Sequence, residues 1–121
     1  MNQAIFVGRI VEEPSVELTE EETVISKITV AVPRPYKNKE GVYETDFIDC
    51  TLWDSVAQRT AEYCKKGDVI GIKGRIQTNL VEKEGEKKKF MNIVAEKVTF
   101  LSSRQKEQEK SNEDVEQDIE K

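Results

Sequence analysis

The chain has 121 residues, 36% of them apolar and 36% charged, with a net charge of −5 and no histidine. This length predicts one domain, and no apolar run approaches the roughly 18 residues of a membrane span. The lack of histidine removes the commonest general base and metal ligand, and Cys50 and Cys64 do not have the spacing of a metal site. We therefore expect no enzyme activity, no cofactor or metal, no membrane association and a protein of the reducing cytoplasm.

Charge and polarity divide the chain near residue 101. Residues 1–101 hold 15 basic and 17 acidic side chains, a net charge of −2, whereas residues 102–121 hold 4 basic and 7 acidic ones, a net charge of −3. The second segment has only Val115 and Ile119 as apolar side chains, too few to offset the entropy of ordering. We expect a compact domain at 1–101 and a short acidic tail at 102–121 that is disordered or a frayed helix.

The segment 2–11 is predicted to be a strand with apolar side chains on both faces. One face carries Ala4, Phe6 and Ile10. The other face carries Ile5, Val7 and Val11. A strand that is apolar on both faces is usually buried on both, but a small barrel has its core on one face only. The second face therefore predicts an interface between subunits.

A second strand is expected over 23–32, with Ile28, Val30 and Val32 facing the core. The segment 33–41 that follows is rich in proline, lysine and arginine, and it ends in glycine. Such a composition predicts a long basic turn that is rigid at its prolines and loose at residues 38–41.

The segment 46–53 is predicted to be a strand because it is rich in β-branched and aromatic residues. Alternation assigns Ile48, Cys50 and Leu52 to the core face. The outward face carries Phe47, Asp49, Thr51 and Trp53. Two large aromatic residues among polar ones are typical of a platform for flat ligands, of which nucleobases are the commonest for a small β domain. The alternative is that a loop, a helix or a second subunit covers Phe47 and Trp53.

A single helix is expected from Asp54 or Ser55, as the capping residue, to about Cys64, with Gly67 as its stop. The next strand covers 68–80, with Ile70, Ile72, Gly74 and Ile76 inward. Gly74 in the middle of a strand predicts a bend or a close backbone approach. A turn at Glu84–Gly85 leads to a last strand that runs from Lys87 to Leu101.

Three strands, one helix and two strands are the order of an OB-fold. The predicted fold is therefore all-β, a five-stranded Greek-key barrel with one helix between strands three and four. Over residues 1 to about 101 the chain also resembles the bacterial single-stranded DNA-binding proteins. The segments that carry this resemblance are Ile5-Phe6-Val7-Gly8-Arg9-Ile10, Glu13-Pro14, Ile28 to Asn38, Asp46 to Trp53, Tyr63-Cys64-Lys65-Lys66-Gly67-Asp68 and Gly74-Arg75-Ile76-Gln77-Thr78.

The resemblance implies a homotetramer of OB-folds that binds single-stranded DNA with little sequence preference, by base stacking and phosphate contacts. It implies stacking aromatic residues at Tyr36, Phe47 and Trp53. A further aromatic usually follows strand four in this family, and here Val81 takes its place. The expected role is protection of the strand during replication, recombination, repair or DNA uptake, with replication or recombination proteins as partners. The short tail, which lacks a Pro-Phe tip, resembles accessory forms used in DNA uptake, by phages or by mobile elements.

Phosphate contacts are predicted at seven basic residues: Arg34, Lys37, Lys39, Lys65, Lys66, Arg75 and Lys87. For each lysine the alternative role is solubility. A protein-interaction adaptor that kept the barrel and lost DNA binding is the alternative function, favoured by the acidic balance of the domain. An enzyme built on Asp46, Asp49 and Asp54 is disfavoured, because alternation puts Asp46 and Asp49 on opposite faces of their strand.

Overall fold

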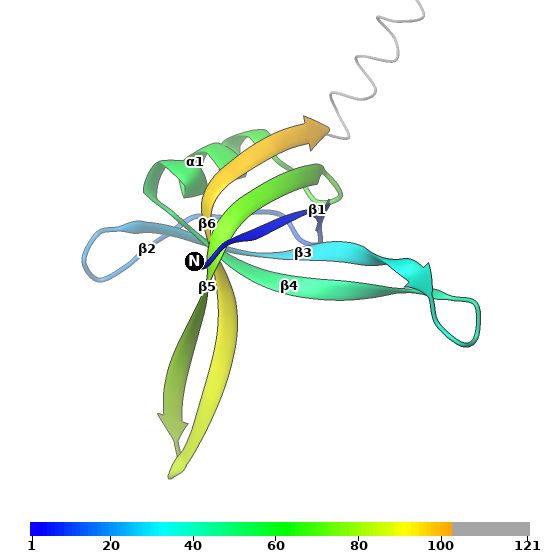
Figure 1. Cartoon of the computed structure of the whole chain (residues 1–121). Helices are drawn as coiled ribbons and strands as arrows, with labels where there is room; N and C mark the ends of the chain where they lie inside the picture. Colours follow the sequence, from blue (N-terminus) through cyan, green and yellow to red (C-terminus); the bar gives the residue numbers. More distant parts are fainter. Residues whose placement is uncertain (103–121) are drawn as a thin grey trace, which may run out of the picture.

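A computed structural model describes residues 1–102 (Figure 1). The elements are β1 (Ala4–Ile10), β2 (Glu17–Leu18), β3 (Val24–Lys37), β4 (Tyr43–Trp53), α1 (Asp54–Tyr63), β5 (Val69–Lys83) and β6 (Glu86–Ser102). The predicted tail at 102–121 lies, apart from Ser102, outside the described residues.

The strands β1, β5, β6, β4 and β3 are hydrogen-bonded in that order, and a pairing of β1 with β3 closes the barrel. The β4–β6 pair is parallel and the other pairs are antiparallel. The short β2 is added at the edge of β3. This closed five-stranded barrel, with α1 between β4 and β5, confirms the predicted OB-fold.

The predicted core faces are largely confirmed. The buried apolar residues of the barrel include Ile10, Ile28, Val30, Cys50, Leu52, Ile70, Ile72, Ile93 and Ala95. Ala57 of α1 is completely buried against the same core. Ile76, predicted to face inward, is instead 43% exposed. The reason is that β5 has left the barrel at this point, since its pairing with β1 ends at Gly74.

Two details of the β4–α1 region differ from the sequence-based expectation. Thr51, assigned to the outward face, is only 8% exposed and accepts a hydrogen bond from Asn92. The N-cap of α1 is Trp53, without a side-chain capping bond, and not Asp54 or Ser55. Asp54 has a φ of 52°, so the chain turns sharply from β4 into the helix.

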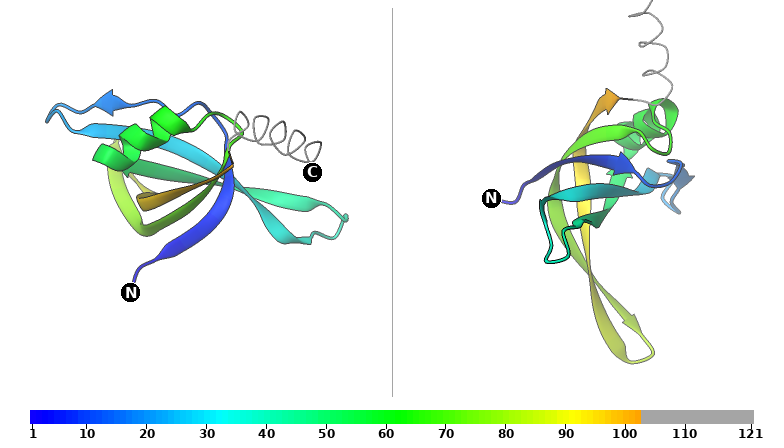
Figure 2. Two further views of the ribbon diagram at one scale, coloured as in Figure 1. Left: turned by 90° about the horizontal axis from the view of Figure 1, so that it is seen from above. Right: turned by 90° about the vertical axis from the view of Figure 1, so that its right-hand side faces the viewer.

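Two hairpins extend beyond the barrel (Figures 1 and 2). One is the end of β3 with the start of β4. Here the predicted turn over 33–41 is too long, because Pro33 to Lys37 belong to β3 and only about Asn38 to Val42 form the turn. The Asn38 side-chain oxygen accepts hydrogen bonds from the backbone N–H groups of Glu40 and Val42, which closes the turn tightly.

The second hairpin is formed by residues 77–91 of β5 and β6, which we call the arm. Within the described residues these strands pair only with each other there, because β4 meets β6 from Ile93 onward. The predicted turn is confirmed at Glu84 and Gly85, which have φ values of 54° and 80°. The arm projects from the end of the barrel opposite to α1 (Figure 1).

Gly74 lies where β5 passes β6 at very short range. A Cβ atom built on Gly74 would stand 2.3 Å from the carbonyl oxygen of Val94. The pairing register also shifts between Lys73 and Gly74. The predicted close backbone approach is therefore confirmed, and it marks the point where β5 bends out of the barrel toward the arm.

Within residues 1–102, no helix is long and apolar enough to cross a membrane. In the same range, no three histidine, cysteine, aspartate or glutamate side chains are grouped as they would be to hold a metal ion.

Candidate nucleic-acid interface

The outward face of β4 exposes three aromatic side chains. Phe47 is 65% exposed and Trp53 is 38% exposed, as the alternation of the strand predicts. Tyr43 has the same odd-numbered register and is 54% exposed, so it joins the same face. The cross-strand partner of Phe47 is Ala31, whose small side chain leaves the phenyl ring open. We call Tyr43, Phe47 and Trp53 the β4 platform.

The outward face continues from β4 onto β6 and β5. The Asn92 side-chain nitrogen donates a hydrogen bond of 2.6 Å to the Thr51 hydroxyl, so Asn92 points to the side of the β4 platform. Gln77 pairs with Asn92, and Arg75 pairs with Val94. Since directly paired residues share a face, Arg75 and Gln77 lie on this same outer surface.

A groove of about 330 Å³ runs between the outer surfaces of β3 and β4 and the base of the arm. Its barrel wall includes Lys27, Thr29, Asp49 and Thr51. Its other wall includes Asn79 and Phe90 of the arm, with Asn92 next to the arm on β6. The groove therefore combines hydroxyl, amide, ammonium and carboxylate groups with an aromatic ring. Such a surface suits a chain of bases joined by phosphates better than a small compact ligand.

Arg34 at the β3–β4 hairpin is held by two carboxylates. Its guanidinium lies 2.6 Å from Glu44 and 2.9 Å from Asp46, and Nε donates to Asp46 at 3.1 Å. Hydrogen bonding to Asp46 and its negative charge raise the pKa of Arg34 above the ordinary value. The same hydrogen bond lowers the pKa of Asp46. In the unbound chain the charge of Arg34 is thus largely compensated by these two carboxylates.

The other predicted residues of this hairpin are open. The Lys37 ammonium lies 5.6 Å from the centre of the Tyr43 ring, so a cation and an aromatic face are presented together. Lys39 is exposed in the turn. Tyr36 is 62% exposed and lies where the β3–β4 register is irregular, between Pro33 and Lys37.

The remaining predicted cations do not gather at one place. Arg75 is on the outer surface and lies 4.0 Å from Glu96. Lys87 pairs with Glu82, and alternation puts it on the arm face opposite to Phe90. The register instead puts Lys88 on the Phe90 side. Lys65 and Lys66 follow α1 in the chain, and α1 lies at the end of the barrel away from the arm (Figure 1).

The predicted interface residues lie on the outer face of β1. Ile5 is 72% exposed and Val7 is 52% exposed, while Val11, just after the strand, is half-buried. The opposite face of β1 packs on the core through Phe6 and Ile10. Ile5 and Val7 thus stay largely exposed in the described chain, which agrees with the two-sided pattern seen in the sequence.

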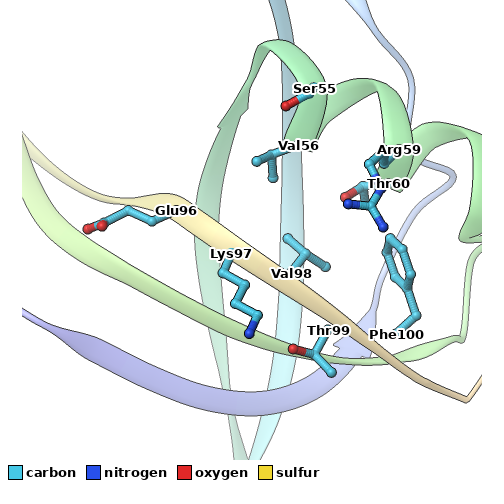
Figure 3. Close-up of a pocket in the computed structure, with 9 residues that line it drawn as sticks. All are labelled: Ser55, Val56, Arg59, Thr60, Glu96, Lys97, Val98, Thr99 and Phe100. Atoms are coloured by element: carbon cyan, nitrogen blue, oxygen red, sulfur yellow. The ribbon is translucent and has the colours of Figure 1, made fainter.

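A separate hollow of about 390 Å³ lies between α1 and β6 (Figure 3). Its apolar part consists of Val56, Val98 and Phe100, which pack against the core. Arg59 and Lys97 lie among its polar residues. Because α1 is at the end opposite to the arm, this hollow is distinct from the groove beside the β4 platform.

Sequence patterns missed three residues of the outer surface: Tyr43, Lys88 and Phe90. The signal for Tyr43 was available, because it lies four residues before Phe47 and a strand repeats every two residues. No comparable local signal exists for Lys88 and Phe90, whose face depends on the register between β5 and β6.

A closed five-stranded barrel with an exposed aromatic surface and an adjoining groove is typical of an OB-fold, the class of barrel that binds oligonucleotides and oligosaccharides. The model of the single-strand binding protein family matches residues 1–101. The chain therefore belongs to this family.

Several bacterial relatives are similar over most of this chain. Single-stranded DNA-binding protein B of Bacillus subtilis is 37% identical over 107 residues, which are 88% of this chain and 95% of that protein. Single-stranded DNA-binding protein 3 of Listeria innocua is 40% identical, over 87% of this chain and 66% of that protein. The single-stranded DNA-binding protein of Halalkalibacterium halodurans is 37% identical, and the match covers 62% of its length. The chain thus spans just under two thirds of the last two relatives.

A solved structure shares the fold. The Plasmodium falciparum SSB in complex with ssDNA superposes with a TM-score of 0.74, at 16% sequence identity. The match covers 84% of this chain and 96% of that one.

Proposed function

We propose that this protein binds single-stranded DNA with little sequence preference, and protects it during replication, recombination, repair or DNA uptake. The observation that carries the proposal is the β4 platform, with Phe47 and Trp53 exposed beside a groove on a barrel of this family. Binding needs no catalysis and no cofactor, and it takes place in the cytoplasm. Residues 1–101 form the binding domain, and 102–121 are a short acidic tail.

Binding rests on two kinds of contact. Bases of a single strand stack on aromatic faces, and this is indifferent to sequence because every base has a π-face. We assign stacking to Tyr36, Phe47 and Trp53. Cations near the platform follow the phosphates, and we assign this role foremost to Lys37, Lys39 and Arg75.

The remaining assigned cations contribute less. Arg34 contacts a phosphate only after its ion pairs with Glu44 and Asp46 break. Lys87 lies on the other face of the arm, and Lys65 with Lys66 contact only DNA that passes the α1 end of the barrel.

Titration with oligo-dT tests the function. Trp53 is the only tryptophan, so its emission reports one place on the platform. We expect oligo-dT to quench this emission and to be retained in gel shift, and duplex DNA of the same length to bind far more weakly. Absence of a shift with oligo-dT at micromolar protein would refute the proposal.

The same titration decides between this function and an interaction adaptor that has lost DNA binding. Besides the acidic balance of the domain, the adaptor is favoured by the compensation of Arg34 by Glu44 and Asp46 on the exposed hairpin. An adaptor would keep the fold and show neither quenching nor a gel shift.

The protein works as a homotetramer that uses the outer face of β1, with Ile5, Val7 and Val11. A Val7→Arg variant would place an unpaired charge in that interface, which is costly. Light scattering should then report a smaller particle. The matched control is Val16→Arg, because Val16 is similarly exposed, 47% against 52%, and lies outside β1. A monomeric mass for the unmutated protein would contradict this assembly.

A further inference from the structure

Phe90 is an exposed aromatic residue to which sequence patterns assigned no role. It lies on β6 within the arm and is 53% exposed. Its direct cross-strand partner is Asn79, a polar residue, so no aromatic or aliphatic side chain stands opposite the ring. The arm therefore gains little from Phe90 in the way of cross-strand packing.

The direction of the Phe90 side chain follows from its neighbour on the same strand. Asn92 reaches across to the Thr51 hydroxyl at 2.6 Å, on the side of the β4 platform. Phe90 is two residues away on β6, and residues two apart in a strand share a face. Phe90 thus points to the surface that carries Phe47 and Trp53.

Phe90 also stands between two hollows. It lines the platform groove together with Thr29 and Asp49, and it lines a second hollow of about 360 Å³ on the arm together with Val81 and Lys88. Of the described residues, it is the one shared by the linings of these two hollows. A strand that left the platform along this surface would cross the Phe90 ring before it reached Lys88.

We propose that Phe90 is a further stacking residue for a base of single-stranded DNA, and that it guides the strand from the β4 platform onto the arm. This inference rests on the proposed function. Val81 stands where the family resemblance implies an aromatic residue, and Val81 pairs with Lys88, which puts Phe90 diagonally across from it on the same face. The chain thus supplies from β6 the ring that β5 lacks.

Alanine substitution tests the assignment against a control on the same arm. Leu80 is 73% exposed and alternates with Asn79 and Val81, so it faces the other side of the arm. We expect Phe90→Ala to weaken oligo-dT binding about five-fold or more, the factor that corresponds to 1 kcal/mol of stacking. Leu80→Ala should change it less than about two-fold. Equal, small effects of the two substitutions would overturn the inference.

A spectroscopic variant makes the test independent of affinity. In Trp53→Phe/Phe90→Trp the one tryptophan stands at position 90, and stacking predicts that oligo-dT quenches its emission. The inference is overturned if this variant retains labelled oligo-dT in anisotropy while its emission stays constant. If the unmutated protein binds no oligo-dT at all, the proposed function fails, which is a different result from binding that ignores position 90. Circular dichroism identifies any alanine variant that has lost its fold, and in that case the tryptophan variant decides.

Discussion

Removing the Phe47 ring should separate DNA binding from folding. Phe47 is 65% exposed, so only about a third of its surface contributes to folding. Full burial of such a side chain is worth about 1.5–3 kcal/mol, and a third of this is about 0.5–1 kcal/mol. Stacking with one base is worth about 1–3 kcal/mol, or about 5- to 150-fold in affinity. A Phe47→Ala variant should therefore lose more in binding than in stability.

A core substitution of equal cost to the fold is the control. Ile72 is 2% exposed and faces the barrel interior, and Ile→Val in a core costs about 0.5–1.5 kcal/mol. Ile72→Val should thus match Phe47→Ala in urea unfolding and leave oligo-dT affinity unchanged. Because the phenyl ring carries no charge, Phe47→Ala should leave the salt dependence of the affinity unchanged. The logarithm of the affinity should still fall with the logarithm of salt concentration by roughly 0.7 per neutralised phosphate.

The assay is anisotropy of labelled oligo-dT at several salt concentrations, beside urea unfolding of each variant. Two results would refute the reasoning. If Phe47→Ala and Ile72→Val bind equally well, the ring does not touch the strand. If Phe47→Ala alters the salt slope, Phe47 acts through the placement of cations and not through stacking.

Three further predictions follow from other parts of the molecule. Asp46→Asn removes one of the two carboxylates that hold Arg34, so we expect tighter oligo-dT binding at low salt. The slope of the logarithm of affinity against the logarithm of salt concentration should become steeper by under about one unit. An unchanged slope would mean that Arg34 does not contact the DNA. Gly74→Ala puts a Cβ atom 2.3 Å from the Val94 carbonyl oxygen, and urea unfolding should show a loss of about 1–3 kcal/mol; full stability would mean that the β5 bend relaxes freely. Burial, with the nearby Asp49 charge, raises the pKa of the Cys50 thiol to about 12. The thiol of the unfolded chain ionises near pH 8.5. The stability that the folded chain gains by keeping Cys50 neutral is therefore complete below about pH 8.5 and is lost as pH rises toward 12. Unfolding midpoints from pH 8 to 10 should therefore fall less in Cys50→Ala than in the unmutated protein, and parallel curves would contradict the assigned burial.

The sequence predicted those parts of the fold that depend on local periodicity. Ile28, Val30, Cys50 and Leu52 are buried as alternation required, because a strand that lines a core must repeat its apolar residues every two positions. Gly74 could also be interpreted from the sequence alone, because a glycine inside a strand usually marks a bulge, a bend or a close backbone approach.

The parts that the sequence left open depend on register between strands. Arg34 meets Glu44 and Asp46 because β3 continues past its prolines and pairs with β4, which the proline-rich composition argued against. Thr51 is buried because Asn92 from a distant strand covers it. Phe90 faces the groove because of the register between β5 and β6. These are long-range pairings, and no local pattern encodes them.

The acidic balance of the chain bears on which kind of contact dominates. The binding domain has a net charge of −2. At the β3–β4 hairpin Arg34 is paired with two carboxylates, and on the outer surface Arg75 lies 4.0 Å from Glu96. These two arginines must lose a protein partner before they neutralise a phosphate, whereas Lys37 and Lys39 are exposed, so counterion release depends mainly on the lysines. The aromatic rings carry no such cost, because they are already exposed in the unbound chain. Stacking should therefore supply the larger share of binding, and the affinity of this protein for oligo-dT should decline with salt more shallowly than that of a basic OB-fold of equal site size.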